Sequence, residues 1–160
     1  EKYWVMRRES FNLLRQKVKG KMAVPFVDDF GVKPEYLSEF LPKLYKLLEE
    51  NGIQPTLAGH VGDGNFHIIP LMDLNKKGEK EKIMPVLEKF SNLVNEYKGT
   101  MSSEHNDGLI RASFIEKQFG KKVYSLFEET KKIFDPKGIF NPNKKINVDP
   151  DFIKAHIKAK

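Results

Sequence analysis

Hydrophobic side chains recur at three- and four-residue intervals in several stretches of the chain. This spacing places them on one face of an α-helix and therefore predicts helices. The predicted helices are residues 3–19, a segment opened by Pro34 and ended by Asn51-Gly52, about 80–97, and 113–134. Pro34 suits the first turn of a helix, and Gly120 is expected to interrupt the last of these segments.

Short extended segments lie between these helices. The predicted strands are residues 23–32, 54–60, 65–71 and 100–103. Pro25 has no backbone N–H to donate, which limits how central the first of these strands can be. Helices that alternate with short strands and a hairpin predict an α+β fold, with helices packed on one face of an antiparallel sheet.

Length and composition narrow the class of protein. The chain has 160 residues and no stretch suited to a linker, so we expect one domain over residues 1–160, with an irregular but ordered tail over 135–160. It has no signal peptide, and it starts at Glu1 without an initiator Met, directly before the helix predicted at 3–19, so we expect a piece of a longer protein. Cysteine is absent, which excludes thiol catalysis, disulfides and cysteine-ligated metals within the chain and is compatible with a cytoplasmic origin.

The net charge of +6 could indicate an anionic partner. The lysines are scattered, however, and most stand beside glutamates in predicted helices and loops. This arrangement is typical of a solvated surface, and no nucleic-acid recognition module accompanies it, so we expect no nucleic-acid partner.

The stretch GHVGDGNFH, residues 59–67, carries the first candidate site. Asp63-Gly64 is a preferred two-residue hairpin loop. That loop predicts three directly opposed pairs: Gly62 with Asn65, Val61 with Phe66, and His60 with His67. Opposed residues share one sheet face with Cβ atoms about 4.5–5.5 Å apart, so His60 and His67 could hold one metal ion. A glycine-rich turn flanked by two unrelated histidines remains the alternative.

The segment SSEHNDG, residues 102–108, places Glu104 and His105 where a predicted strand meets a turn. Glu104 would complete a set of two histidines and one carboxylate, while His105 would stay free as a general base. Neighbouring residues of an extended chain point to opposite faces, so this requires the turn to redirect one of them.

Arg7, on the first predicted helix, is suited to binding a carboxylate.

These motifs, with FDPKGIFNPNKKI after them and WVMRRESFNLLR and PFVDDFGVKPEYLSEFL before them, resemble the C-terminal domain of FAD-linked oxidases and dehydrogenases. The glycolate oxidase flavin subunit, D-lactate dehydrogenase and D-2-hydroxyglutarate dehydrogenase belong to this family. The resemblance implies a ferredoxin-like α+β cap over a flavin that an upstream FAD-binding domain of the same chain holds. It also implies a small 2-hydroxy acid as substrate, and an iron–sulfur domain or a quinone as electron acceptor.

The resemblance also implies roles for single residues. His60, His67 and Glu104 would bind a divalent metal, with zinc expected, and His105 would be the catalytic base. Arg7 would bind the substrate carboxylate. Near the FAD, the resemblance places Asn141, Asn143 and Lys144.

Three positions depart from the 2-hydroxyglutarate branch of the family. Phe11 stands in place of a small hydroxylated residue, Ile69 in place of Asn, and Asn106 where Gly is common. The three residues implied to bind the metal are all present, whereas polar residues that would contact the substrate are replaced by Phe11 and Ile69. We therefore expect D-lactate, glycolate or a related acid as substrate rather than a dicarboxylate. Two other functions stay open: a metal-dependent hydrolase, and a non-catalytic anion-binding module. For the parent enzyme we expect a cytoplasmic location, or a peripheral one at the cytoplasmic face of the membrane.

Overall fold

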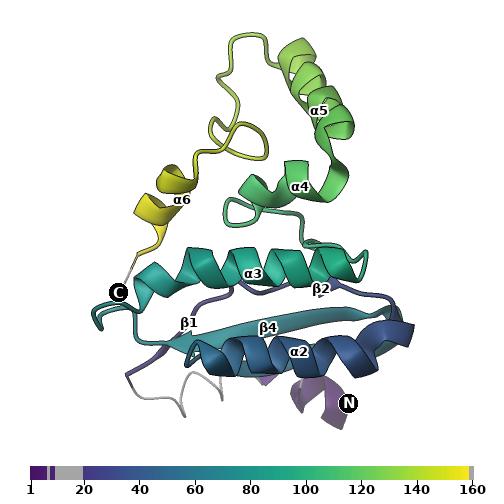
Figure 1. Ribbon diagram of the computed structural model, residues 1–160, viewed down its shortest axis with the longest axis vertical. Helices are drawn as coiled ribbons and strands as arrows, with labels where there is room; N and C mark the ends of the chain where they lie inside the picture. The colour runs from purple at the N-terminus through teal and green to yellow at the C-terminus, as the bar shows by residue number, and fades with distance from the viewer. Residues whose placement is uncertain (7, 10–19, 159–160) are drawn as a thin grey trace.

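A computed structural model describes residues 1–6, 8–9 and 20–158 (Figure 1). Residues 2–6 and 8–9 are helical, as predicted for this segment, and residues 10–19 lie outside the described part of the chain. The other helices are α2 (Leu37–Glu50), α3 (Ile83–Glu96), α4 (Ile115–Phe119), α5 (Lys121–Phe134) and α6 (Pro150–His156). The strands are β1 (Met22–Ala23), β2 (Phe30–Gly31), β3 (Gln54–His60) and β4 (Asn65–Met72).

The sheet is antiparallel and is organised around β4. Strand β3 pairs along one side of β4, from the pair of Gln54 with Leu71 to the pair of His60 with Asn65. The short strands β1 and β2 pair with opposite ends of the same β4, at Met72 and at Phe66 respectively. The α+β fold with an antiparallel sheet is therefore confirmed.

Two of the predicted strands are much shorter than expected. The predicted strand 23–32 pairs only at its two ends, because the chain leaves the ladder between β1 and β2, where Pro25 and the Asp28-Asp29 pair stand. The predicted strand 100–103 is reduced to a single bridge between Thr100 and Gly31. Both departures bring irregular backbone alongside β4, and the candidate site uses that backbone.

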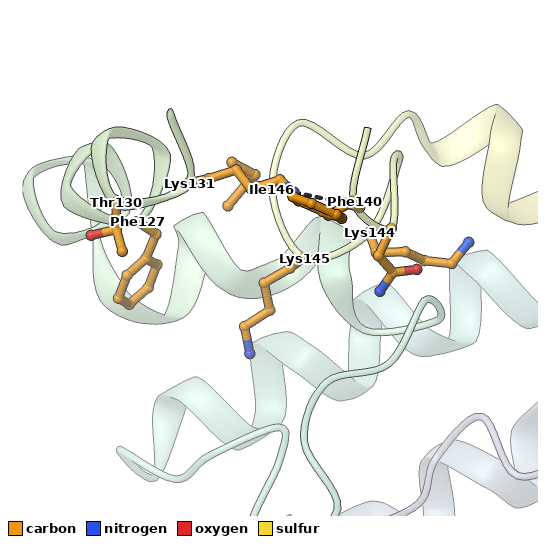
Figure 2. Close-up of a pocket in the computed structure, with 8 residues that line it drawn as sticks. Phe127, Thr130, Lys131, Phe140, Lys144, Lys145 and Ile146 are labelled. Atoms are coloured by element: carbon orange, nitrogen blue, oxygen red, sulfur yellow. Dashed lines mark hydrogen bonds between the residues drawn. The ribbon is translucent and has the colours of Figure 1, made fainter. Parts of the chain in front are cut away.

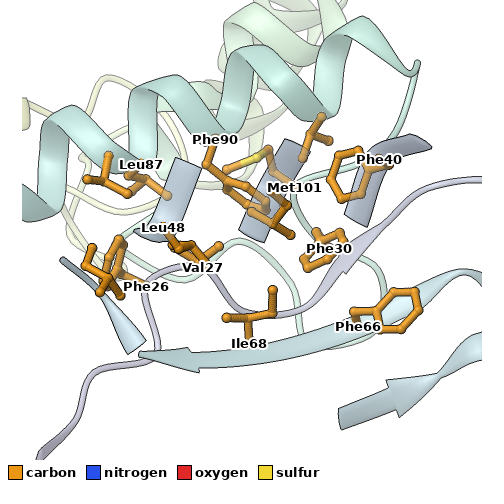
Figure 3. Close-up of a cluster of buried hydrophobic side chains, with 14 of the residues drawn as sticks. Phe26, Val27, Phe30, Phe40, Leu48, Phe66, Ile68, Leu87, Phe90 and Met101 are labelled. Carbon is orange, nitrogen blue, oxygen red and sulfur yellow. The ribbon is translucent and has the colours of Figure 1, made fainter. Parts of the chain in front are cut away.

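Helices α2 and α3 pack on one face of the sheet and bury the main hydrophobic core. Phe30 lies at its centre: its ring centroid is 5.4 Å from that of Phe40, 5.7 Å from that of Phe66 and 5.2 Å from that of Phe90. Figure 3 shows Ile68 rising from β4 into the same cluster. Because side chains alternate along a strand, His67 lies on the face of β4 opposite to Phe66 and Ile68.

From about residue 112 onward, α4, α5 and the loop that follows α5 form an arm that rises away from this sandwich (Figure 1). Gly120, with φ of 78°, separates α4 from α5, as the sequence predicted. The expectation of an irregular tail over 135–160 is wrong for α6, where the Asp149 side chain accepts a hydrogen bond from the backbone N–H of Asp151 and caps the helix. Ile153, 1% exposed, anchors α6. No helix among the described residues is long and apolar enough to cross a membrane.

Candidate functional site

The hairpin between β3 and β4 is built differently from the prediction. His60 pairs with Asn65, and Ala58 pairs with His67, so the predicted direct pairing of His60 with His67 is wrong by two residues. The loop has four residues, because a single 3₁₀ turn, Val61–Asp63, precedes Gly64. A shift by one residue would move a side chain to the other face of the sheet, whereas a shift by two does not. The two histidines therefore still share a face.

Gly64 fixes the position of this hairpin tip. Its φ is 69°, a left-handed conformation that glycine adopts without strain. A Cβ atom on Gly64 would lie 1.8 Å from the carbonyl oxygen of Val32, and the Gly64 carbonyl accepts a hydrogen bond from the Val32 N–H at 3.0 Å. The tip is thus held against the segment that follows β2.

One oxygen of the Glu104 carboxylate meets three imidazoles. Its Oε1 lies 2.7 Å from Nε2 of His67, 3.7 Å from Nε2 of His60 and 3.7 Å from Nε2 of His105. The rings of His67 and His105 are 5.3 Å apart between centroids. The structure therefore brings together the four residues that the sequence singled out in two separate turns. The distances to Glu104 do not distinguish His60 from His105 as a third ligand, but the ligand atoms that all lie within 4.8 Å of one another belong to Asp29, His67, Glu104 and His105, without His60.

His67 is held between two carboxylates. Its Nδ1 lies 2.8 Å from Asp28 Oδ1, and its Nε2 lies 2.7 Å from Glu104 Oε1. Burial by itself lowers the pKa of His67, but the hydrogen bonds and charges of Asp28 and Glu104 outweigh it and raise that pKa above the usual value. Since carboxylates only accept hydrogen bonds, the metal-free chain favours an imidazolium that donates from both nitrogens.

Sequence reasoning missed two residues of this site, Asp28 and Asp29. Asp29 is fully buried beneath the turn that carries Glu104 and His105. Burial alone would raise the pKa of Asp29, yet the backbone N–H groups of these two residues, the charge of Arg111 and a side-chain hydrogen bond from Ser102 lower it. One signal in the sequence could have revealed them. Two adjacent aspartates interrupt the predicted strand 23–32, and a continuous strand does not account for them.

The donor set fits a divalent metal ion such as zinc. Tetrahedral zinc binds imidazole nitrogens and carboxylate oxygens at about 2.0–2.2 Å, so two ligand atoms lie about 3.3–3.5 Å apart. The two separations of 3.7 Å from Glu104 are close to this value. The 2.7 Å separation from His67 is a hydrogen bond that would lengthen when a metal replaced the shared proton. Asp28 would then accept from Nδ1 of the ligating His67, the usual outer partner of a metal-bound histidine.

The remaining predicted residues lie elsewhere. Arg7 is outside the described residues. Asn141 and Lys144 line a cavity of about 300 Å³ between α5 and the loop that follows it (Figure 2), whereas Asn143 is not among the lining residues. The other residues that line the cavity are Phe127, Thr130, Lys131, Phe140, Lys145 and Ile146. The Lys145 ammonium donates to Asn106 Oδ1 at 2.5 Å and contacts Asp107, which links this cavity to the turn after His105.

Comparison with known proteins places the chain in a family. Residues 1–145 match the family model described as FAD linked oxidases, C-terminal domain. The chain belongs to this family. It is 29% identical over 144 residues to D-2-hydroxyglutarate dehydrogenase of Haemophilus influenzae and 31% identical over 142 residues to that of Pseudomonas putida, which covers 90% and 88% of this chain. It is 33% identical over 116 residues, 72% of this chain, to D-lactate dehydrogenase of Archaeoglobus fulgidus.

This FAD-linked oxidase C-terminal domain corresponds to only part of those relatives. The matched region covers 14% of each of the two D-2-hydroxyglutarate dehydrogenases and 25% of the D-lactate dehydrogenase.

Of the three departures noted in the sequence, Phe11 lies outside the described residues. Asn106 has φ of 64°, a left-handed conformation that glycine adopts readily and that asparagine tolerates. Ile69 is 7% exposed and offers no polar atom on the His67 face.

Proposed function

We propose that this chain is the substrate-binding domain of an FAD-dependent dehydrogenase that oxidises a small 2-hydroxy acid, such as D-lactate or glycolate, to the 2-oxo acid. The proposal rests on one observation: a single oxygen of the half-exposed Glu104 carboxylate lies 2.7–3.7 Å from imidazole nitrogens of three histidines, His60, His67 and His105. Membership of the FAD-linked oxidase family and the names of the relatives support it over a hydrolase or a non-catalytic module.

His60, His67 and Glu104 are the residues proposed to hold a divalent metal, with zinc expected. When bound, such an ion supplies a Lewis acid that makes a coordinated hydroxyl more acidic. FAD, held mainly by an upstream domain, supplies the acceptor for the hydride that leaves C2 of the substrate. The chain's own residues bind, orient and deprotonate the substrate.

His105 is proposed to accept the hydroxyl proton. Its side chain is 62% exposed, so Nε2 can reach a ligand, while its backbone is fixed by a hydrogen bond to Asp29. Nε2 also lies 3.7 Å from Glu104 Oε1, so the imidazolium that forms on proton transfer has a carboxylate close by. Arg7 is proposed to bind the substrate carboxylate and so to orient C2.

The size of the substrate is inferred from Ile69. It is buried on the same strand face as His67 and two residues beyond it, so this position cannot donate a hydrogen bond to a second carboxylate. A dicarboxylate bound there would leave a charge without a partner, which is costly. D-lactate or glycolate carries no second carboxylate and is the proposed class.

The arm is proposed to dock on the upstream FAD-binding domain. No residue of α5, every one of which the structure describes, is buried. Ile133 and Phe134 at its end are 74% and 79% exposed, and Ile139 and Phe140 in the next loop are each 63% exposed. Four large apolar side chains exposed over eight successive positions are more than isolated surface residues, and they favour an interaction site here. Docking there would place Asn141, Asn143 and Lys144 beside the FAD, as the resemblance implies.

The electron acceptor and the location belong to the same proposal. We infer that electrons pass from the flavin to an iron–sulfur domain or to a quinone. We place the enzyme in the cytoplasm or at the cytoplasmic face of the membrane. The absence of cysteine from the chain is compatible with that compartment.

The test is the oxidation of D-lactate, glycolate and D-2-hydroxyglutarate by the chain joined to its flavin-binding domain, with an artificial electron acceptor. His105→Ala should lower kcat by roughly 10²–10⁴ and leave FAD bound, because the base is lost and the fold is not. His156→Ala is the matched control, since this histidine lies in α6 and bonds to the Phe152 carbonyl. Equal turnover of wild type and His105→Ala would remove His105 from the mechanism.

A further inference from the structure

Asp29 is a buried carboxylate with an unusually complete set of donors. It is 0% exposed, and its φ of 59° lies in the left-handed region. Oδ1 accepts from the backbone N–H of Glu104 at 2.9 Å, and Oδ2 accepts from the backbone N–H of His105 at 2.8 Å. Three further donors lie at 3.3 Å: Asn65 Nδ2, Ser102 Oγ and the backbone N–H of Ser103.

These donors decide between two roles for Asp29. Its carboxylate lies within 4.8 Å of ligand atoms of His67, Glu104 and His105, so distance alone would allow it to be a metal ligand. A carboxylate has about four lone-pair sites. Five donors already point at Asp29, and a guanidinium nitrogen of Arg111 lies 3.6 Å from Oδ2. No lone pair is left for a metal ion.

We infer that Asp29 is a positioning residue, which shapes the turn that carries Glu104 and His105 and does not bind the metal. The inference rests on the proposed function for its consequence at the site. Glu104 and His105 are adjacent, and in a regular strand their side chains would point to opposite faces. The Asp29 carboxylate accepts hydrogen bonds from the backbone N–H groups of both residues, so the backbone bends at this point. Because of the bend, the side chains of Glu104 and His105 can both approach His67.

Arg111 holds the same turn from its other end. Its Nε donates to the Asp107 carbonyl at 3.2 Å, and its two terminal nitrogens donate to the carbonyls of Asp28 and Asn106. Arg111 is 7% exposed, so its charge also compensates the buried charge of Asp29. The turn is therefore fixed to the Asp28-Asp29 segment by an anion that binds its N–H groups and a cation that binds its carbonyls.

Asp29→Asn is the informative substitution. Asparagine has the same shape and tolerates a left-handed φ, so the backbone itself is not strained. One of its two terminal atoms is an NH₂ group, which cannot accept. Because Glu104 and His105 donate to different oxygens, either orientation of the amide leaves one of the two N–H groups without an acceptor. Asp73→Asn is the matched control, since Asp73 accepts from the N–H of Asn75 in a turn far from the site.

The experiment uses the chain with Zn²⁺ alone, by titration calorimetry, together with ¹H–¹⁵N spectra. We expect Asp29→Asn to weaken Zn²⁺ binding about 10–100-fold, as loss of an outer-shell partner does, and to shift the amide signals of Glu104 and His105. Asp73→Asn should change neither. Unchanged affinity and unchanged signals at both amides in Asp29→Asn would overturn the inference.

Two measurements on the wild-type chain cover the remaining outcomes. If Zn²⁺ does not bind, the proposed metal site fails, but the positioning role of Asp29 can still be tested by hydrogen exchange. Slow exchange of the Glu104 and His105 amides would support their hydrogen bonds to Asp29, and fast exchange would refute them. If Zn²⁺ binds, the carboxyl ¹³C signal of Glu104 should shift strongly and that of Asp29 little. Equal shifts would make Asp29 a ligand. Neither measurement requires the variant to fold.

Discussion

Replacing Asp28 with Asn tests whether the site depends on the carboxylate behind His67. Asp28 Oδ1 lies 2.8 Å from His67 Nδ1, and the two side chains are 27% and 17% exposed. Asparagine keeps an oxygen that can accept from Nδ1 but removes the charge, and charge-assisted hydrogen bonds are roughly twice as strong as neutral ones. Removal of an outer-shell partner costs 10–100-fold in metal affinity. Because Asn retains the hydrogen bond and water reaches this pair, we expect a loss of about 10-fold, or about 1.4 kcal/mol.

The assay is titration of the chain with Zn²⁺ by calorimetry at constant pH. Asp63→Asn is the matched control, because it removes one negative charge from the exposed hairpin turn beside the site. A general electrostatic effect would weaken both variants equally, whereas the proposed contact weakens only Asp28→Asn. Equal affinities of Asp28→Asn and wild type would show that His67 needs no partner at Nδ1, and the outer-shell reasoning would fail.

Two further predictions concern stability without metal. His67 has a raised pKa in the folded chain, so its contacts with Asp28 and Glu104 stabilise the fold fully below the unfolded value of about 6.5 and lose this effect as pH rises through the folded pKa. Urea unfolding in a chelator should therefore show a drop in stability as the pH rises above about 6.5 that His67→Gln reduces; the same drop in both proteins would contradict this assignment. Gly64→Ala should destabilise the chain by about 2 kcal/mol or more, because of its left-handed φ and the Val32 carbonyl oxygen 1.8 Å from the new Cβ. Gly62→Ala has no atom within 4 Å of the new Cβ and should be nearly neutral, and comparable urea midpoints for the two variants would disprove the steric argument.

Local pattern was enough to predict the hairpin strands and the helices that pack on them. Strands at 54–60 and 65–71 were predicted, and the structure has Gln54–His60 and Asn65–Met72. The register was wrong because a Gly-Asp-Gly turn is compatible with loops of two or four residues, and the contact of Gly64 with Val32 that accompanies the longer loop joins segments far apart in the sequence. The pairing of the histidines with Glu104 survived because the error was an even number of residues.

The sequence could not reveal what depends on contacts between distant segments. Asp29 acts on backbone N–H groups about 75 positions away along the chain, and no periodicity records such a contact. Residues 100–103 were predicted as a short strand after Gly99, but their backbone turns toward Asp29 after the single bridge at Thr100. In the tail, α6 was missed because the density of Pro, Gly and Asn before it obscured the start that Asp149 provides.

Successive side chains of β4 point to opposite faces, so one face of this strand contributes to the core and the other to the candidate site. Phe66 and Ile68 face the packed helices and belong to the hydrophobic core, while His67 between them points to the opposite face, where it contacts Asp28 and Glu104. A family built on this strand can change its chemistry by exchanging odd-numbered positions and leave the scaffold intact. Variation in substrate among its members should therefore concentrate at positions such as Ile69, with the even-numbered positions restricted to residues that fill the interior.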